Sequence, residues 1–168
     1  MVAALLCLPA ALPAGGSAAV GRVVAEDSLA PALLRDINAV RNSHGLKPLK
    51  LSPDLSAAAS FHSREMALSG FFAHESRDGS AFDKRIARFY PRKKAYGSWA
   101  VGENLVYASP DLSAAQAVNL WMHSPGHREN LLSPVWREIG LGAVHALAAP
   151  RTFGGLDVTL VTADFGAR

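Results

Sequence analysis

Apolar residues recur at helical spacing in the first part of the chain. Leu29, Leu33 and Ile37 lie four positions apart and therefore fall on one face of a helix. Ser28 precedes this run, where a hydroxyl can cap a helix, and Gly45 follows it, where glycine often ends one. The pattern predicts a first helix between these two residues.

Boundary residues predict two more helices. Ser52-Pro53 is a start signal, because proline is tolerated at the first helical position, and Gly70 is a matching end. After the turn signal Asp78-Gly79, residues 82–89 carry phenylalanine and isoleucine at helical spacing and stop before Pro91. We therefore expect a long second helix and a short third one.

The second half of the chain changes from helical to strand periodicity. A fourth helix is expected to open at Ser109-Pro110-Asp111 and to be broken at Ser124-Pro125-Gly126, and only a short turn is expected at residues 127–132. Residues 139–147 and 157–165 are rich in Val, Ile, Leu and Thr. This composition predicts two strands that form an antiparallel hairpin.

The order of these elements indicates the fold class. Residues 99–107 have the composition of one further strand, so helices precede and cover a small sheet, and the fold class is α+β. No repeat or low-complexity stretch divides residues 28–168, which we interpret as one domain. Residues 20–27 are interpreted as a short tether.

The beginning of the chain has the character of a targeting segment. The first nineteen residues carry no charge, and their apolar run at residues 2–12 is shorter than the roughly 20 residues that a bilayer span needs. Residues 1–19 therefore predict a secretory signal peptide, with a buried N-terminal helix as the alternative. Cys7, the only cysteine, lies within it, so we expect no disulfide framework and no thiol nucleophile in the mature protein. We expect a secreted or cell-envelope protein without a transmembrane anchor.

Composition and charge exclude several classes of protein. Hydrophobic residues make up 49% and charged residues 18% of the chain, which excludes a disordered chain and a protein with several membrane spans. The 17 basic and 14 acidic residues give a net charge of +3 without a run of like charges, so nucleic acid is not expected as a partner. A basic cluster surrounds Pro91 and comprises Arg85, Arg88, Arg92, Lys93 and Lys94. We interpret it as a solvated loop, with contact to an anionic cell-wall polymer or lipid headgroup as the alternative.

Histidine and glutamate stand beside glycine or proline in three segments at the boundaries of predicted elements. These are Phe71-Phe72-Ala73-His74, Gly102-Glu103-Asn104-Leu105, and Ser124-Pro125-Gly126-His127-Arg128-Glu129-Asn130-Leu131-Leu132. Loops at element ends can present polar side chains to a cleft. Two imidazoles and one carboxylate with an open position suit a zinc ion and the water that it acidifies. His74, Glu103 and His127 are therefore candidate site residues.

The three segments belong to a longer series of motifs. The series is Ile37-Asn38-Ala39-Val40-Arg41, Gly45-Leu46-Lys47-Pro48-Leu49, Phe72 with His74, Gly102-Glu103-Asn104, Trp121-Met122-His123-Ser124-Pro125-Gly126-His127-Arg128 with Asn130-Leu131-Leu132, Gly140-Leu141-Gly142 and Thr162-Ala163-Asp164-Phe165-Gly166. In this order it resembles the CAP superfamily, also called the SCP domain family, in its short bacterial secreted form. The resemblance implies an α-β-α sandwich, with a small central antiparallel sheet flanked by helices.

The resemblance also implies a cleft that holds two histidines and two glutamates and that binds a divalent metal in some members. His74, Glu103 and His127 match three of these positions, whereas Trp121-Met122-His123-Ser124 lacks the second glutamate. No cofactor is required on this interpretation, and zinc or another divalent cation held by His74 and His127 is optional. Structural support of the cluster is expected from Asn104, Ser124, Arg128 and Asn130.

Two functions remain open at this stage. The first is an extracellular binding module whose ligand is a lipid, a sterol, a cell-wall or other cell-surface component, or a protein. The second is a metal-assisted hydrolase of peptide or cell-wall bonds through His74, Glu103 and His127, with Glu103 and His127 as candidate catalytic residues. In a third interpretation Glu103 only fixes the tautomer of a histidine within a hydrogen-bonded polar cluster. We favour the binding module, and whether the chain is an enzyme stays open.

Overall fold

The computed structural model describes residues 22–92 and 97–168. The signal peptide expected at residues 1–19 lies outside the described residues, as do Lys93 and Lys94 of the basic cluster.

A sheet of five strands runs through the described part of the chain. β5 (Val158–Ala167) pairs antiparallel with β3 (Ala100–Ala108) on one side and with β4 (Glu138–Ala146) on the other. β1 (Val23–Ala25) pairs antiparallel with β4, and the short β2 (Lys50–Leu51) pairs parallel with it. The strand order places β3 at one edge of the sheet. The expected hairpin and the expected earlier strand are both confirmed.

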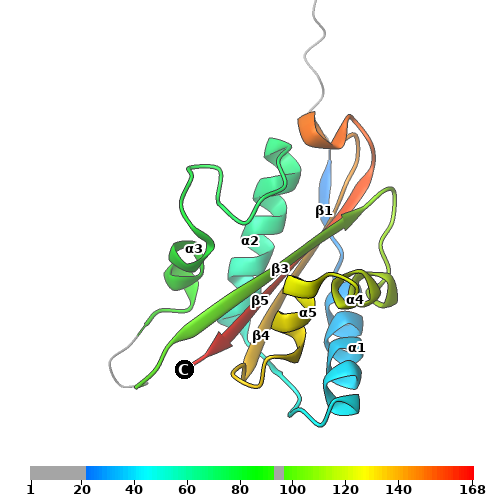
Figure 1. The fold of residues 1–168 in the computed structure, drawn as a ribbon. Coiled ribbons are helices and arrows are strands. Elements are labelled where there is room, and N and C mark those ends of the chain that lie inside the picture. The colour runs from blue at the N-terminus through cyan, green and yellow to red at the C-terminus, as the bar shows by residue number, and fades with distance from the viewer. Residues whose placement is uncertain (1–21, 93–96) are drawn as a thin grey trace, which may run out of the picture.

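Helices cover both faces of this sheet. α2 (Pro53–Ser69) and α3 (Phe82–Phe89) lie on one face, to the left in Figure 1. α1 (Leu29–Ser43), α4 (Ala114–Met122) and α5 (Pro125–Leu132) lie on the other face. The arrangement confirms the α+β class and the α-β-α sandwich.

Each face of the sheet buries its own apolar cluster. Leu33 and Ile37 of α1 and Trp121 of α4 are almost completely buried against one face, and Met66 of α2 is buried against the other. The indole Nε1–H of Trp121 also donates a hydrogen bond to the carbonyl oxygen of Leu105 at 3.0 Å. This bond attaches α4 to the backbone of β3.

Two glycines of β4 allow α2 to lie directly on the sheet. A Cβ atom added to Gly140 would overlap main-chain atoms of Leu55 and Ser56, and one added to Gly142 would overlap main-chain atoms of Ala59 and Ser60. Backbone can give way much less than a flexible side chain. The Gly-Leu-Gly motif is therefore explained by the close approach of helix and strand.

The structure corrects two boundaries in the second half of the chain. α4 begins at Ala114 and not at Ser109, because Ser113 and Gln116 form a reciprocal capping box at 2.9 and 3.3 Å. Residues 125–132 form the helix α5 in place of the expected short turn. Pro125 explains this, since proline at the first helical position starts a new helix as readily as it ends the preceding one.

The segment expected to be a tether, residues 20–27, contains β1. Val23–Ala25 pairs with residues 144–146 of β4, so these three residues belong to the sheet. Ser28 precedes α1 as expected, but its side chain makes no capping hydrogen bond.

Candidate functional site

A buried ion pair anchors His74. Glu103 on β3 is 4% exposed, and its two carboxylate oxygens have different partners: Oε1 lies 2.8 Å from Nδ1 of His74, and Oε2 accepts from Arg85 of α3. The fully buried Arg85 also donates to the carbonyl oxygen of His74 at 3.0 Å and to Oγ of Ser76 at 3.2 Å. Arg85 and Glu103 therefore fix both the backbone and the side chain of His74.

This arrangement sets the tautomer and the charge of His74. The hydrogen bond to Glu103 raises the pKa of the His74 imidazole above its usual value, against the opposing effect of partial burial. Because Nδ1 faces Glu103, the other ring nitrogen, Nε2, is left on a side chain that is 47% exposed. His74 is thus a half-exposed imidazole held by a buried carboxylate.

A second carboxyl group lies across the strand pair from Glu103. Asp164 of β5 is directly opposite Glu103 in the sheet, is fully buried, and receives no hydrogen bond from the donors of the described residues. Burial, followed by the charge of Glu103, raises the pKa of Asp164 well above its usual value. The neutral form of Asp164 is therefore favoured more strongly than that of an exposed aspartate.

The raised pKa of Asp164 makes its contribution to stability fall as the pH rises. The neutral form is favoured in the folded chain, so its stabilising effect is complete below the unfolded pKa of about 3.9 and is lost as the pH passes through the folded pKa. Asp164→Asn lacks this titration. We expect the free energy of unfolding of Asp164→Asn, measured in urea, to rise relative to that of the wild type between pH 4 and pH 8. An equal or opposite pH trend would contradict this, and Asp83→Asn on the exposed side of α3 is the control.

α5 joins the site from the other face of β3. The amide of Asn104 donates to the carbonyl oxygen of His127 at 2.9 Å, and the amide of Asn130 donates to Oδ1 of Asn104 at 2.9 Å and to the carbonyl oxygen of Glu103 at 3.1 Å. Partial burial, followed by the charge of nearby His74, lowers the pKa of the His127 imidazole. His74, Glu103 and His127 therefore lie near one another around β3.

Asn130→Ala should lower the free energy of unfolding by about 1–3 kcal/mol, because it leaves the Glu103 carbonyl and the Asn104 amide oxygen without their donor. Urea denaturation at pH 7 measures this loss. Asn119→Ala, on the exposed side of α4, is the matched control and should change stability by less than about 0.5 kcal/mol. Equal effects of the two substitutions would show that the Asn104–Asn130 contacts carry no net stability.

Most of the chain matches a known protein family. Residues 34–149 match the family described as "CAP: Cysteine-rich secretory protein family", which is more than half of the chain. The chain belongs to the CAP family. This confirms the resemblance seen in the sequence.

Two proteins of Bacillus subtilis are similar to part of this chain. The uncharacterized protein YkwD is 36% identical over 110 residues, which are 65% of this chain and 40% of that protein. The uncharacterized membrane protein YlbC is 30% identical over 105 residues, 62% of this chain and 28% of that protein. The chain thus matches less than half the length of either relative.

Solved structures show the same fold. An extracellular SCP-domain protein of Bacillus anthracis has a TM-score of 0.66 at 22% sequence identity. The aligned region is 85% of this chain and 41% of that protein. An outer surface protein of Borrelia burgdorferi has a TM-score of 0.65 at 21% sequence identity, and the aligned region is 88% of this chain and 98% of that protein.

Within residues 22–92 and 97–168, none of the helices combines the length and apolar character of a membrane span.

Two charged residues of this CAP site were missed by the sequence analysis. Arg85 was expected in a solvated loop, which is wrong: it is fully buried and paired with Glu103. A signal was present, because Arg85 falls among Phe82, Ile86 and Phe89 on the apolar side of α3. Asp164 carried no such signal, since only the register of β3 and β5 brings it to Glu103.

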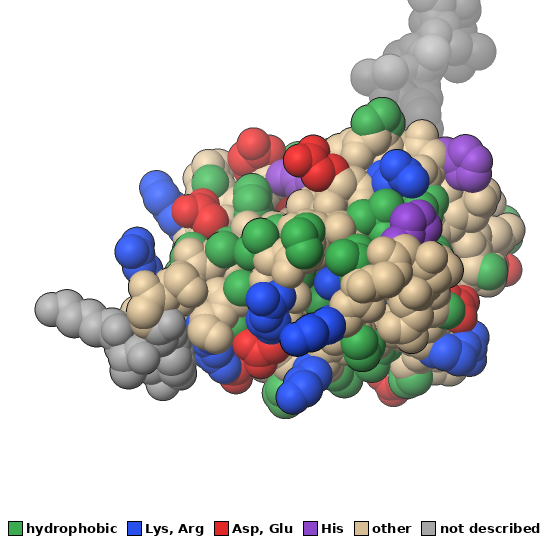
Figure 2. All heavy atoms as spheres, turned by 60° about the horizontal axis from the view of Figure 1, so that its bottom comes forward, with side chains coloured by type: hydrophobic (Ala, Val, Ile, Leu, Met, Phe, Trp, Pro, Cys, Tyr) green, Lys and Arg blue, Asp and Glu red, His purple; other side chains and the backbone are tan. Residues whose placement is uncertain are grey.

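The other expected supports differ in what they do. Asn104 and Asn130 are hydrogen-bonded as described, whereas Ser124 occupies the N-cap position of α5 without a capping hydrogen bond from its side chain. Arg128 is exposed, and its guanidinium makes no hydrogen bond or ion pair within the described residues. Of the rest of the basic cluster, Arg88 is exposed, in line with a solvated surface. Figure 2 shows basic and acidic side chains interspersed over the lower face of the molecule.

The site residues do not fit a zinc ion as they are placed. In the described residues no three His, Cys, Asp or Glu side chains are arranged to hold a metal. The two carboxylate oxygens of Glu103 are engaged by His74 and Arg85, so Glu103 acts as the orienting partner of a histidine rather than as a ligand. His74 and His127 alone fall short of the three protein ligands of a catalytic zinc site.

Proposed function

We propose that this chain is an extracellular CAP domain that binds a component of the cell surface. The observation that carries the proposal is the engagement of Glu103: the buried Arg85–Glu103 pair holds His74 in place, and both oxygens of Glu103 have partners within the cluster. Such a cluster suits the fixed presentation of a side chain to a ligand better than it suits hydrolysis. The signal peptide expected at residues 1–19 and the extracellular and outer-surface descriptions of the two structural neighbours support the location.

An aromatic row beside His74 provides the contact surface. The ring of Phe72 packs edge-on against Tyr107 with centroids 4.8 Å apart, and Tyr107 packs in the same way against Phe153 at 5.1 Å. Tyr107 is 39% exposed, although residues 102–106, which precede it on β3, are buried. We name His74, Phe72 and Tyr107 the His74–Tyr107 edge. Rigid aromatic side chains next to a fixed imidazole favour an apolar or ring-bearing partner, such as a lipid, a sterol or a cell-wall sugar.

Binding of the fluorescently labelled chain to isolated bacterial cell envelopes tests the proposal. We expect Tyr107→Ala to weaken saturable binding by about tenfold or more, because it removes the exposed ring at the centre of the edge. Leu120→Ala, which removes a 49% exposed apolar side chain from α4, is the matched control and should bind like the wild type. Equal binding by both variants and the wild type, or no saturable binding at all, would overturn the proposal.

The metal-assisted hydrolase through His74, Glu103 and His127 is the second candidate. Calorimetric titration of Zn²⁺ separates it from the binding module, because the engaged Glu103 predicts no stoichiometric zinc binding. One zinc ion per chain, bound by the wild type and lost in His74→Ala, would instead favour the hydrolase and justify a screen of peptide and cell-wall substrates.

A further inference from the structure

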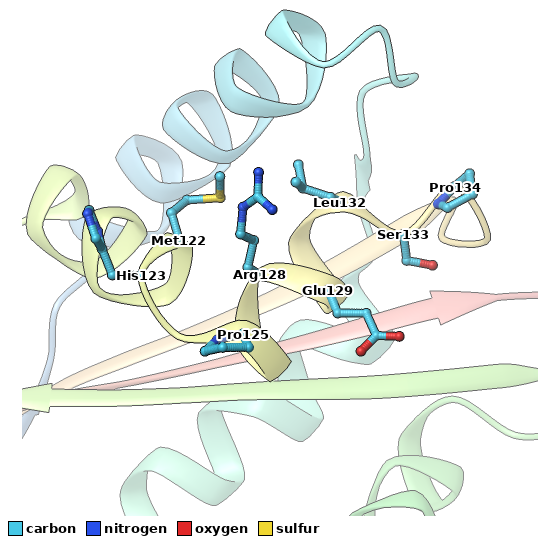
Figure 3. A pocket seen from close by; sticks show the side chains of 8 residues that line it. All are labelled: Met122, His123, Pro125, Arg128, Glu129, Leu132, Ser133 and Pro134. Atoms are coloured by element: carbon cyan, nitrogen blue, oxygen red, sulfur yellow. The ribbon is translucent and has the colours of Figure 1, made fainter.

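A hollow of about 550 Å³ lies between the end of α4 and α5, away from the site described above. Figure 3 shows its lining, which consists of Met122, His123, Pro125, Arg128, Glu129, Leu132, Ser133 and Pro134. His74, Glu103 and Tyr107 do not belong to it. It is therefore a second surface, distinct from the His74–Tyr107 edge.

The guanidinium of Arg128 lies between apolar side chains in this hollow and has no hydrogen-bond acceptor among the described residues. The side chain of Arg128 projects between Met122 and Leu132 (Figure 3), and no oxygen of the described residues accepts a hydrogen bond from its guanidinium. A guanidinium matches a carboxylate with two parallel hydrogen bonds, and it gains strength where neighbouring apolar groups exclude water. The hollow thus offers one anion contact next to an apolar contact.

The walls of the hollow are held rigidly from behind. The buried Arg41 of α1 donates to the carbonyl oxygens of Leu131 at 2.7 Å and of Ser133 at 3.0 Å. Arg137 donates to the carbonyl oxygens of Pro134 at 2.7 Å and of Val135 at 3.0 Å. Two guanidinium groups therefore fix the end of α5 and the turn that follows, and a ligand finds the hollow already formed.

Glu129 adds a second polar contact at another point of the rim. Its carboxylate is directed away from Arg128 (Figure 3), and no donor of the described residues hydrogen-bonds to it. A carboxylate on the rim repels a second anionic group but accepts from an amide N–H. Polar contacts at two points, with apolar side chains beside Arg128, match a short peptide end better than an acyl chain, which needs a continuous apolar lining.

We propose that this hollow binds the C-terminal end of a peptide whose last side chain is apolar. The terminal carboxylate pairs with the guanidinium of Arg128, the last side chain packs against the apolar walls beside Arg128, and a peptide N–H donates to Glu129. The charge on Arg128 and the apolar walls are both needed, so the site selects a free carboxylate over a blocked one. This inference does not depend on the proposed function of the His74–Tyr107 edge.

The test uses acetyl-Ala-Ala-Leu with a free carboxylate, and the same peptide with a C-terminal amide, titrated into the ¹⁵N-labelled chain. We expect saturable shifts of the amide signals of residues 122–134, and affinity about tenfold lower for the amidated peptide and for Arg128→Gln. Arg88→Gln is the matched control, since Arg88 is exposed on α3, and it should bind like the wild type. Tyr107→Ala should also bind this peptide normally, which separates this site from the proposed function.

Four results would overturn the proposal: no saturation up to millimolar peptide, equal affinity for the amidated peptide, wild-type affinity in Arg128→Gln, or shifts centred outside the hollow. Octanoate is the competing probe. If it displaces the peptide and binds more tightly, the ligand is a fatty carboxylate and the peptide assignment is wrong.

Discussion

Arg85→Met should lower the free energy of unfolding by about 3–5 kcal/mol at pH 7, because it leaves the carboxylate of Glu103 buried without its cation. Methionine fills a similar volume, so the loss reports the missing charge and hydrogen bonds and not a cavity. Urea denaturation at pH 7 measures the loss.

Two further variants make this result specific. Arg88→Met removes an exposed arginine from the same helix and should change stability by less than about 0.5 kcal/mol. Arg85→Met combined with Glu103→Gln should be more stable than Arg85→Met alone, because the uncompensated charge is gone. A loss below about 1 kcal/mol in Arg85→Met, or no recovery in the double variant, would show that the ion pair does not anchor the site.

Gly140→Ala is expected to have a comparably large effect. The added methyl group would overlap the main chain of α2 at Leu55 and Ser56, and no side-chain rotation can relieve a backbone overlap. We expect a loss of about 3 kcal/mol or more, at the upper end of the range for overpacking, because the helix must move away from the sheet.

Gly126→Ala provides the opposite control. Nothing lies within 4 Å of a Cβ atom at Gly126, which is in α5, and alanine is the better helix former. It should leave stability unchanged or raise it by up to about 1 kcal/mol. Thermal and urea unfolding of both variants measure the contrast. A Gly140→Ala variant as stable as the wild type would mean that α2 does not rest on the backbone of β4.

Local signals in the sequence were sufficient for most of the fold. Glycine at residues 45 and 70 ends α1 and α2 with positive φ, and Ser52-Pro53 starts α2, as expected. The predicted start of α4 was wrong because Ser113, not Ser109, makes the capping box, and two serines so close together cannot be told apart from the sequence. β2 has only two residues, too few for any period to be visible.

The site was predictable only in part, for a physical reason. His74, Glu103 and His127 stand within recognisable motifs, although Glu103 lies inside β3 and not at its end, and the structure brings them together near β3. The partners of a buried charge, in contrast, depend on tertiary structure. Arg85 lies on α3 and Asp164 on β5, so sequence spacing does not predict that either residue lies next to Glu103 of β3.

The hydrogen bonds that Trp121 and Asn130 donate to the backbone of β3 also affect how the protein associates in concentrated solution. β3 is the last strand at its side of the sheet, yet the carbonyl oxygens of Glu103 and Leu105 in its middle already accept from Asn130 and Trp121. A strand from a second molecule would need these acceptors to extend the sheet. Trp121 and Asn130 therefore make this edge of the sheet less able to pair with a strand of another molecule.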